Sequence, residues 1–201
     1  MNLKLLLAFA FLAGAIFSVR ADNETALPFV SPMFGDNMVL QRGKPNTIWG
    51  WAKPGDKITV EIAGHSAKVI AGNDGRWETK IDPPKTGGPY TLKISDAQQS
   101  VEFHEVLVGD VWLCGGQSNM EFGLGAAKNG TNEVKAAEHP EIRLFFVQHH
   151  VAYVPSKIPQ GQWKICSPET VTQDGWMGFS AVGYFFGRAL QDKLHVPIGL
   201  V

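Results

Sequence analysis

The chain has 201 residues, of which 44% are hydrophobic and 18% are charged, and its formal net charge is −1. This composition is typical of a packed globular protein, and the length predicts one large domain or two small ones. No dense cluster of lysine and arginine is present, so nucleic acid is not an expected partner. The composition therefore argues against a protein that binds its partner mainly through charge. It does not indicate which reaction, if any, the protein catalyses.

The first 21 residues are predicted to be a secretory signal peptide. Lys4 supplies a positive charge, and an uncharged apolar run follows from Leu5 to Phe17. This run is shorter than the roughly 20 apolar residues that a membrane span needs. The pattern predicts a secreted or periplasmic protein with no membrane anchor after the signal is removed.

Two cysteines, Cys114 and Cys166, would then enter a compartment where disulfides persist. A bridge between them is one interpretation, and two buried free thiols are the other. The sequence leaves this choice open because it does not show whether the two residues meet in space.

Residues 22–104 have the pattern of short β-strands. Apolar side chains alternate with polar ones at Ile58, Val60 and Ile62, and the pattern repeats at residues 77–81, 90–94 and 101–103. Turn sequences separate these segments at residues 53–56, 73–75 and 87–89. Short strands at this spacing predict a small β-sandwich domain over residues 22–104.

The pattern changes in residues 105–201, where an α/β fold with a parallel sheet is expected. Residues 106–113 are apolar on both faces, as in a strand covered on both sides. A short helix is expected near residues 132–137 and a second strand at residues 142–147. A longer helix from Ser180 to Leu194 and a third strand at residues 198–201 follow. The apolar stripe of the longer helix is predicted to be Val182, Phe185, Phe186, Ala189 and Leu190.

The chain ends within that third strand. An incomplete sheet would leave the apolar strand Ile198–Val201 exposed and its backbone groups unpaired. We therefore expect the sequence to be a fragment of a longer protein.

Ser118 follows the first buried strand of this region after a Gly-Gly turn. Ligands bind at the carboxyl ends of strands in open α/β sheets, so a serine here lies where a reaction can take place. Its backbone N–H can donate to the oxyanion of a tetrahedral intermediate. The alternative is a polar loop in which Ser118 only caps a helix. Met120 stands where an α/β-hydrolase elbow has glycine, so that motif is excluded.

The run Gly109–Glu121, GDVWLCGGQSNME, closely resembles the nucleophile block of the sialate O-acetylesterase family, within the SGNH hydrolase class. Residues 32–42, PMFGDNMVLQR, resemble the opening of that family's N-terminal β-domain. Residues 179–188 and 196–200 resemble its next helix and strand. The resemblance covers roughly residues 27–201 and implies the first part of an SGNH-type three-layer domain with a parallel sheet.

The resemblance implies that Ser118 is the nucleophile of an esterase that removes O-acetyl groups from sialic acids. It also implies that Gly116, Gln117 and Asn119 form the substrate and oxyanion neighbourhood. The Asp-x-x-His pair that activates the serine, and the remaining oxyanion donors, match segments beyond residue 201. Without that histidine the serine hydroxyl has no general base. This chemistry needs no metal or cofactor, and the expected partner is an acetylated sugar.

Two other interpretations remain open. The chain can be a non-catalytic carbohydrate-binding or vestigial protein, or an esterase that takes its base from another chain. The sequence does not specify an oligomeric state. Asp192 and His195 have the spacing of a catalytic pair, but they stand at a helix end expected to lie far from Ser118.

Four other side chains have both a structural and a functional interpretation. His149 and His150 follow the second strand, so they belong to the same rim of the sheet as Ser118, where they either line the pocket or lie in a solvated loop. Trp49 and Trp51 share one face of a strand, where they either form a sugar-stacking platform or pack in the core.

Overall fold

The computed structural model describes residues 27–201, and the predicted signal peptide of residues 1–21 lies outside this range. The strands are β1 (Val39–Gln41), β2 (Asn46–Trp51), β3 (Lys57–Ile62), β4 (His65–Ile70), β5 (Arg76–Ile81), β6 (Gly87–Ser95), β7 (Ser100–Trp112), β8 (His139–Phe145), β9 (Trp163–Cys166) and β10 (Ile198–Leu200). The helices are α1 (Ser118–Glu121), α2 (Gly130–Lys135) and α3 (Ala181–Leu194), with 3-10 turns at Leu124–Ala126 and Thr170–Thr172. The predicted mixed α/β class is confirmed.

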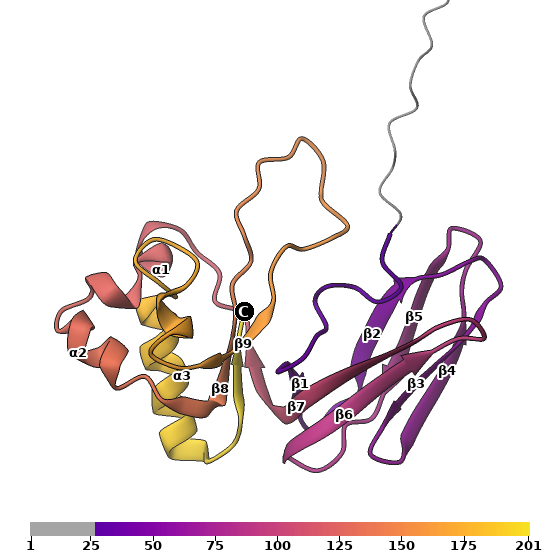
Figure 1. Cartoon of the computed structure of the whole chain (residues 1–201), viewed down its shortest axis with the longest axis horizontal. Coiled ribbons are helices and arrows are strands. Elements are labelled where there is room, and N and C mark those ends of the chain that lie inside the picture. Colours follow the sequence, from indigo (N-terminus) through magenta and orange to yellow (C-terminus); the bar gives the residue numbers. More distant parts are fainter. Residues whose placement is uncertain (1–26) are drawn as a thin grey trace, which may run out of the picture.

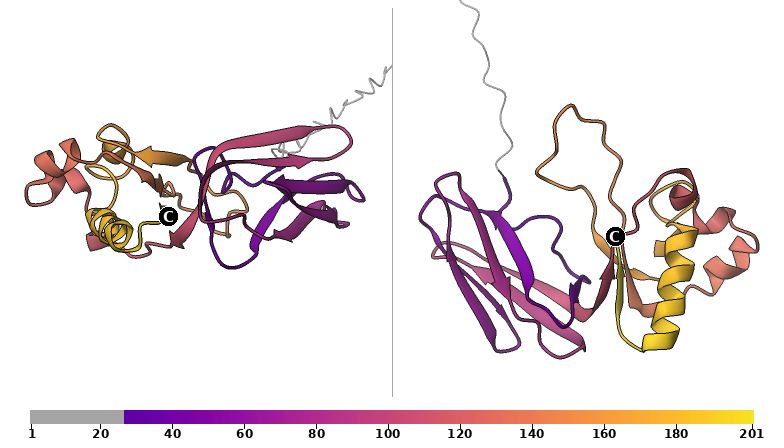
Figure 2. Two further views of the ribbon diagram at one scale, coloured as in Figure 1. Left: turned by 90° about the horizontal axis from the view of Figure 1, so that it is seen from below. Right: turned by 180° about the vertical axis from the view of Figure 1, so that it is seen from behind.

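The strands are arranged in two sheets. The larger sheet has the order β4-β3-β6-β7-β10-β8-β9, and β1 pairs with β7 off this path. β7, β10 and β8 run parallel to one another, as β1 does to β7, and the other pairs are antiparallel. β2 and β5 form the second sheet, which is antiparallel. Figures 1 and 2 show the helices at one end of the molecule and β2 to β6 at the other, with β7 running between the two ends.

The alternating segments of the N-terminal half form strands as predicted. Ile58 and Val60 of β3 are fully buried, whereas Glu61 is exposed. Trp77 of β5 belongs to the same apolar core, and its indole N–H donates to the Phe29 carbonyl at 2.9 Å. One core therefore joins residues of both sheets, while the β-sandwich itself stays a prediction.

The expected domain boundary between residues 104 and 105 falls inside β7, which is one strand from Ser100 to Trp112. The first half of β7 pairs with β6, and the second half pairs with β1 and β10. The register with β6 shifts near Val106, and Glu105 has a positive φ of 54°. The alternation of polar and apolar residues in β7 ends at this point, and an apolar run begins. The sequence pattern therefore predicted two strands where the structure has one. The division into two domains stays a prediction.

The strand Ile198–Leu200 is buried, so the expectation that it would be exposed is wrong. β10 lies between β7 and β8, with Leu200 level with Trp112 on one side and with Leu144 on the other. Ile198 and Leu200 have no exposed surface. Helix α3 covers this strand closely, since a Cβ atom at Gly187 would lie 2.6 Å from the Leu200 side chain.

The predicted apolar stripe of the α3 helix is only partly correct, because Phe185 and Leu190 pack against the core whereas Val182, Phe186 and Ala189 are exposed. The helix begins as expected, because the Ser180 hydroxyl accepts a hydrogen bond from the Gly183 N–H at 3.1 Å. Its buried residues, however, are Ala181, Gly183, Tyr184 and Gly187, whereas Val182 is 51% exposed and Phe186 39% exposed. Gly187 allows the helix to approach Leu200 of β10 closely, and Tyr184 is fully buried in the same apolar core. A prediction from hydrophobic periodicity alone favours large apolar side chains for the buried face, so it misses the buried glycines.

The long segment between β8 and β9 projects from the sheet as an open loop (Figure 1). It follows Phe145 and returns at Trp163, and its tip residues Val151 and Tyr153 are almost completely exposed. Within residues 27–201, no helix is both long and apolar enough to cross a membrane.

Candidate active site

Ser118 is the first residue of α1, in the exposed turn that follows β7. The residue before it, Gln117, is the N-cap, with an extended backbone and no capping hydrogen bond from its side chain. Ser118 is therefore not the cap of this helix, and the interpretation of the turn as a plain polar loop stays open. Within the described chain, neither the Ser118 hydroxyl nor its backbone N–H has a hydrogen-bond partner. Both groups are free to meet a ligand.

The turn that carries Ser118 is held by contacts on both sides. The Cys114 N–H donates to the Val201 carbonyl at 2.7 Å, which ties the turn to the end of the β10 strand. The Ser180 hydroxyl donates to the Met120 sulfur at 3.2 Å, which ties α1 to the start of α3. A Cβ atom at Gly116 would lie 2.9 Å from the Met120 Cβ atom, so the turn needs glycine there.

The four predicted site residues lie together as one exposed segment. Gly116, Gln117, Ser118 and Asn119 are all solvent-exposed at the junction of the turn and α1. In the predicted site, backbone N–H groups of this segment are the donors for the oxyanion. Their individual roles stay predictions.

His149 lies beside α1, on the rim expected from the sequence. β7, β10 and β8 are parallel, so the segments after β7 and β8 leave the sheet at the same edge. The His149 Nδ1 atom lies 3.1 Å from the Glu121 carboxylate, one helical turn beyond Ser118. Both side chains are largely exposed, so this pair adds little stability. His150 is exposed in the same loop.

An exposed apolar shelf adjoins α1, and the sequence patterns did not reveal it. Phe122 and Trp176 have ring centroids 5.5 Å apart, and the Trp176 side chain is 62% exposed. The loop that carries Trp176 packs tightly against the chain after α1, because a Cβ atom at Gly123 would lie 2.2 Å from the Trp176 carbonyl. The only sequence signal was a Trp-Met pair between two glycines in a loop.

The two segments that carry the family resemblance are in direct contact. The Arg42 guanidinium binds the Asp110 carboxylate through two hydrogen bonds, at 2.8 and 3.0 Å. The Gln41 side-chain carbonyl accepts a hydrogen bond from the Val111 N–H at 3.0 Å. The bond to Asp110 raises the pKa of Arg42. Residues 32–42 thus fix the strand that leads to Ser118.

Asp192 and His195 do not approach Ser118. The α3 helix begins beside α1 at Ser180, and its fourteen residues extend about 21 Å before His195. His195 is the exposed C-cap residue, with a positive φ of 50°. The expectation that this Asp-x-x-His pair lies far from the serine is confirmed.

Both cysteines are free thiols, so the bridged alternative is not observed. Cys166 is buried, and its thiol donates to the Ala137 carbonyl at 3.7 Å. Burial raises the pKa of Cys166 to about 12 and also raises the pKa of Cys114. In the part of the chain that the structure describes, no three His, Cys, Asp or Glu side chains are placed to hold a metal ion.

The fold matches a class known from an experimental structure. A carbohydrate acetylesterase from Xanthomonas citri superposes with a TM-score of 0.79 and 37% sequence identity. The match covers 86% of this chain and 39% of that one. No family model matches the chain. The described residues therefore have the fold of a carbohydrate acetylesterase.

Curated relatives narrow this class. Sialate O-acetylesterases from Pongo abelii and Homo sapiens are each 30% identical over 90% of this chain, and the Mus musculus protein is 28% identical over 94%. The chain spans 38 to 39% of the length of these relatives. The resemblance predicted from Gly109–Glu121 is confirmed, and the chain is a homologue of the sialate O-acetylesterases.

Proposed function

We propose that this chain is part of a secreted or periplasmic serine esterase that hydrolyses O-acetyl esters on sugars. The observation that carries the proposal is the placement of Ser118. Its hydroxyl and N–H are free and exposed, at the carboxyl edge of parallel strands. A small β-sandwich over residues 22–104, followed by part of a three-layer SGNH domain over residues 105–201, is the domain organisation that we propose with it.

In the proposed reaction, the Ser118 Oγ atom attacks the carbonyl carbon of the acetyl ester. A general base accepts the hydroxyl proton, and the new oxyanion receives a hydrogen bond from the Ser118 N–H. The resemblance assigns the base to a histidine, oriented by an aspartate, in segments beyond residue 201. The C–O bond to the sugar then breaks, and the base returns the proton to the sugar oxygen. Water hydrolyses the acetyl-serine by the same steps and releases acetate.

The proposed substrate is an O-acetylated sialic acid. The names of the curated relatives support this choice, while the Xanthomonas citri protein supports only the broader class of acetylated carbohydrates. The shelf formed by Phe122 and Trp176 offers an apolar surface beside α1 on which a sugar ring can pack.

Acetate release from an O-acetylated sialic acid glycoside and from acetylated xylan tests this function in the full-length protein. The Ser118→Ala variant is expected to lower kcat by at least about 10³-fold, because the nucleophile is lost. Ser66→Ala, at an exposed serine of β4, is the matched control and is expected to retain wild-type activity. Full activity in Ser118→Ala would overturn the assignment. Sugar binding by a wild-type protein that releases no acetate would support the non-catalytic alternative.

A further inference from the structure

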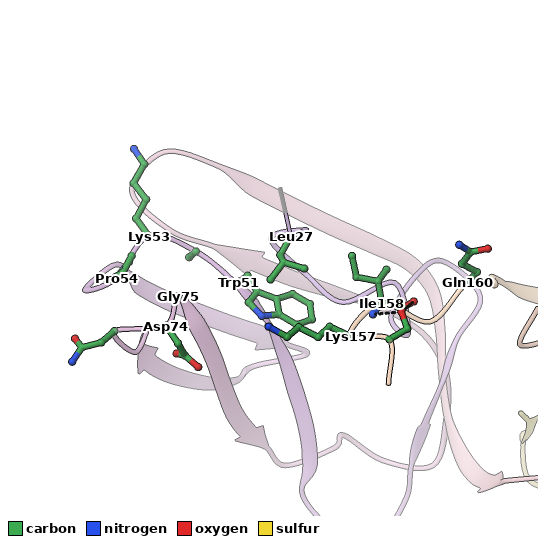
Figure 3. Close-up of a pocket in the computed structure, with 12 residues that line it drawn as sticks. Leu27, Trp51, Lys53, Pro54, Asp74, Gly75, Lys157, Ile158 and Gln160 are labelled. Atoms are coloured by element: carbon green, nitrogen blue, oxygen red, sulfur yellow. Dashed lines mark hydrogen bonds between the residues drawn. The ribbon is translucent and has the colours of Figure 1, made fainter. Parts of the chain in front are cut away.

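A groove of about 970 Å³ lies at the β-strand end of the molecule, apart from the Ser118 turn (Figure 3). One wall comes from the ends of β2 and β5, and the other from the open loop between β8 and β9. Its lining residues include Leu27, Trp51, Asp74, Lys157, Ile158 and Gln160. The groove therefore combines one large aromatic ring with several polar and charged groups, a lining that suits a polar ligand with an apolar face.

Trp51 is the part of the groove that the proposed function does not explain. Its neighbour Trp49 packs edge-on against Phe34, with ring centroids 4.6 Å apart, so Trp49 contributes to packing. The Trp51 ring instead borders the groove, between Leu27 and the loop residue Ile158 (Figure 3). The two tryptophans share one face of β2, opposite the buried Ile48 and Gly50, as predicted, but they have different neighbours. A partly exposed indole gives a flat apolar face for the C–H surface of a sugar ring.

Charged groups stand on either side of that ring. The Lys157 side chain extends from the loop toward Trp51, whereas Lys53 points away from it (Figure 3). The Asp74 carboxylate is fixed by a hydrogen bond from the Arg76 N–H at 3.1 Å. Lys157 offers three hydrogen-bond donors and a positive charge, and Asp74 offers acceptors for hydroxyl groups. A ligand with a carboxylate and several hydroxyls can pair its carboxylate with Lys157 and donate a hydroxyl hydrogen bond to Asp74.

We propose that the groove is a second saccharide site, which binds a sugar unit bearing a carboxylate by stacking it on Trp51 and pairing its carboxylate with Lys157. The sugar class of the ligand rests on the proposed function. The loop that carries Lys157 also holds His149 against Glu121 of α1, so one loop borders both this groove and the Ser118 turn. A glycan held in the groove would engage the same loop that flanks the esterase site.

Calorimetric titration with the methyl glycoside of N-acetylneuraminic acid tests the site, with methyl galactoside as the neutral probe. Trp51→Ala is expected to weaken binding of the acidic probe about tenfold, through the lost stacking. Tyr153→Ala, at a fully exposed ring on the same loop, is the matched control and should bind as wild type.

Lys157→Ala provides a second test that does not depend on the packing around Trp51, because Lys157 is exposed on a loop. We expect about fivefold weaker binding of the acidic probe and unchanged binding of the neutral one. Lys68→Ala, on the exposed side of β4, is its control.

Wild-type affinity in both Trp51→Ala and Lys157→Ala, or no binding of the acidic probe at millimolar concentration, would overturn the proposal. Hydrolysis of 4-nitrophenyl acetate by wild type and Ser118→Ala is measured separately, so failure of the esterase function is distinguished from failure of this site.

Discussion

Two potential nucleophiles, Cys114 and Ser118, lie four residues apart in the turn after β7, and burial distinguishes them. The Ser118 side chain is exposed, whereas Cys114 is half-buried against the start of α3, where a Cβ atom at Gly183 would lie 3.5 Å from the thiol. Burial raises the pKa of the Cys114 thiol, so less of the reactive thiolate is present near neutral pH. The proposed chemistry therefore belongs to the serine, although the cysteine is the stronger nucleophile when ionised.

Thiol labelling under native conditions should separate the two cysteines. At about pH 8 we expect Cys166 to remain unmodified by an aromatic disulfide reagent, because burial holds its pKa at about 12. Cys114 should react, but more slowly than a free cysteine. Mass spectrometry of the labelled chain measures both sites. In denaturant without reductant, both thiols should react, and failure of both to do so would indicate a disulfide that contradicts the structure.

The arrangement of the strands depends on one buried cation in β8. Arg143 is 3% exposed, and its guanidinium donates to the carbonyls of Pro140 at 3.0 Å, Glu105 at 3.3 Å and Asn37 at 3.4 Å. Asn37 and Glu105 both have positive φ angles, of 64° and 54°. Desolvation lowers the pKa of Arg143. This side chain joins β8, the segment before β1 and the middle of β7 at one point.

Replacing Arg143 by methionine should destabilise the fold strongly. The Arg143→Met variant leaves several partly buried carbonyls without donors, and we expect a loss of about 2–4 kcal/mol in the free energy of unfolding. Arg76→Met, at an exposed pair with Glu78, is the matched control and should change stability by less than about 1 kcal/mol. Chemical denaturation of the purified chain measures both. Equal stabilities of the two variants would show that Arg143 does not join these strands.

Helices and strands with a strong local sequence pattern could be predicted from the sequence. Features that depend on packing against distant segments of the chain could not. The alternation at Ile58 and Val60 gives a strand because each side chain faces either core or solvent. The helix cap at Ser180 was also readable, since capping depends on adjacent residues. The buried face of α3 was not readable, because the close approach of Gly187 to Leu200 of β10 depends on where the sheet lies. The role of Arg143 gave no local signal, because two of its acceptor residues, Asn37 and Glu105, are distant in sequence.

Across the whole molecule, an exposed apolar surface lies beside the Ser118 turn, where the larger sheet meets α3. Trp112 and Phe186 pack edge to face with ring centroids 5.1 Å apart, yet they are 43% and 39% exposed. Leu113, next to Trp112, is 82% exposed, and Val182 lies one helical turn before Phe186 on α3. Contiguous apolar surface of this kind favours association or binding.

Charged substitutions on this surface should reduce association of the chain. We expect Leu113→Asp and Val182→Asp to lower the fluorescence of a bound hydrophobic dye and the light scattering of concentrated samples, because each interrupts the apolar surface. Ile70→Asp, at an isolated exposed residue of β4, is the control and should have a smaller effect. Dye binding that is unchanged in the first two variants would show that this surface is not the source of association.

The alternating strands, the cap of α3 and the position of Ser118 after a strand were all predictable from the amino-acid sequence. Each of these depends on residues close together in the chain, where local backbone and side-chain preferences act. Three other features became visible only in the folded chain: β10 lies between β7 and β8, His149 meets Glu121, and Trp51 borders a groove. These features join segments far apart in the chain. Their geometry follows from how the sheets and helices pack, which local pattern does not encode.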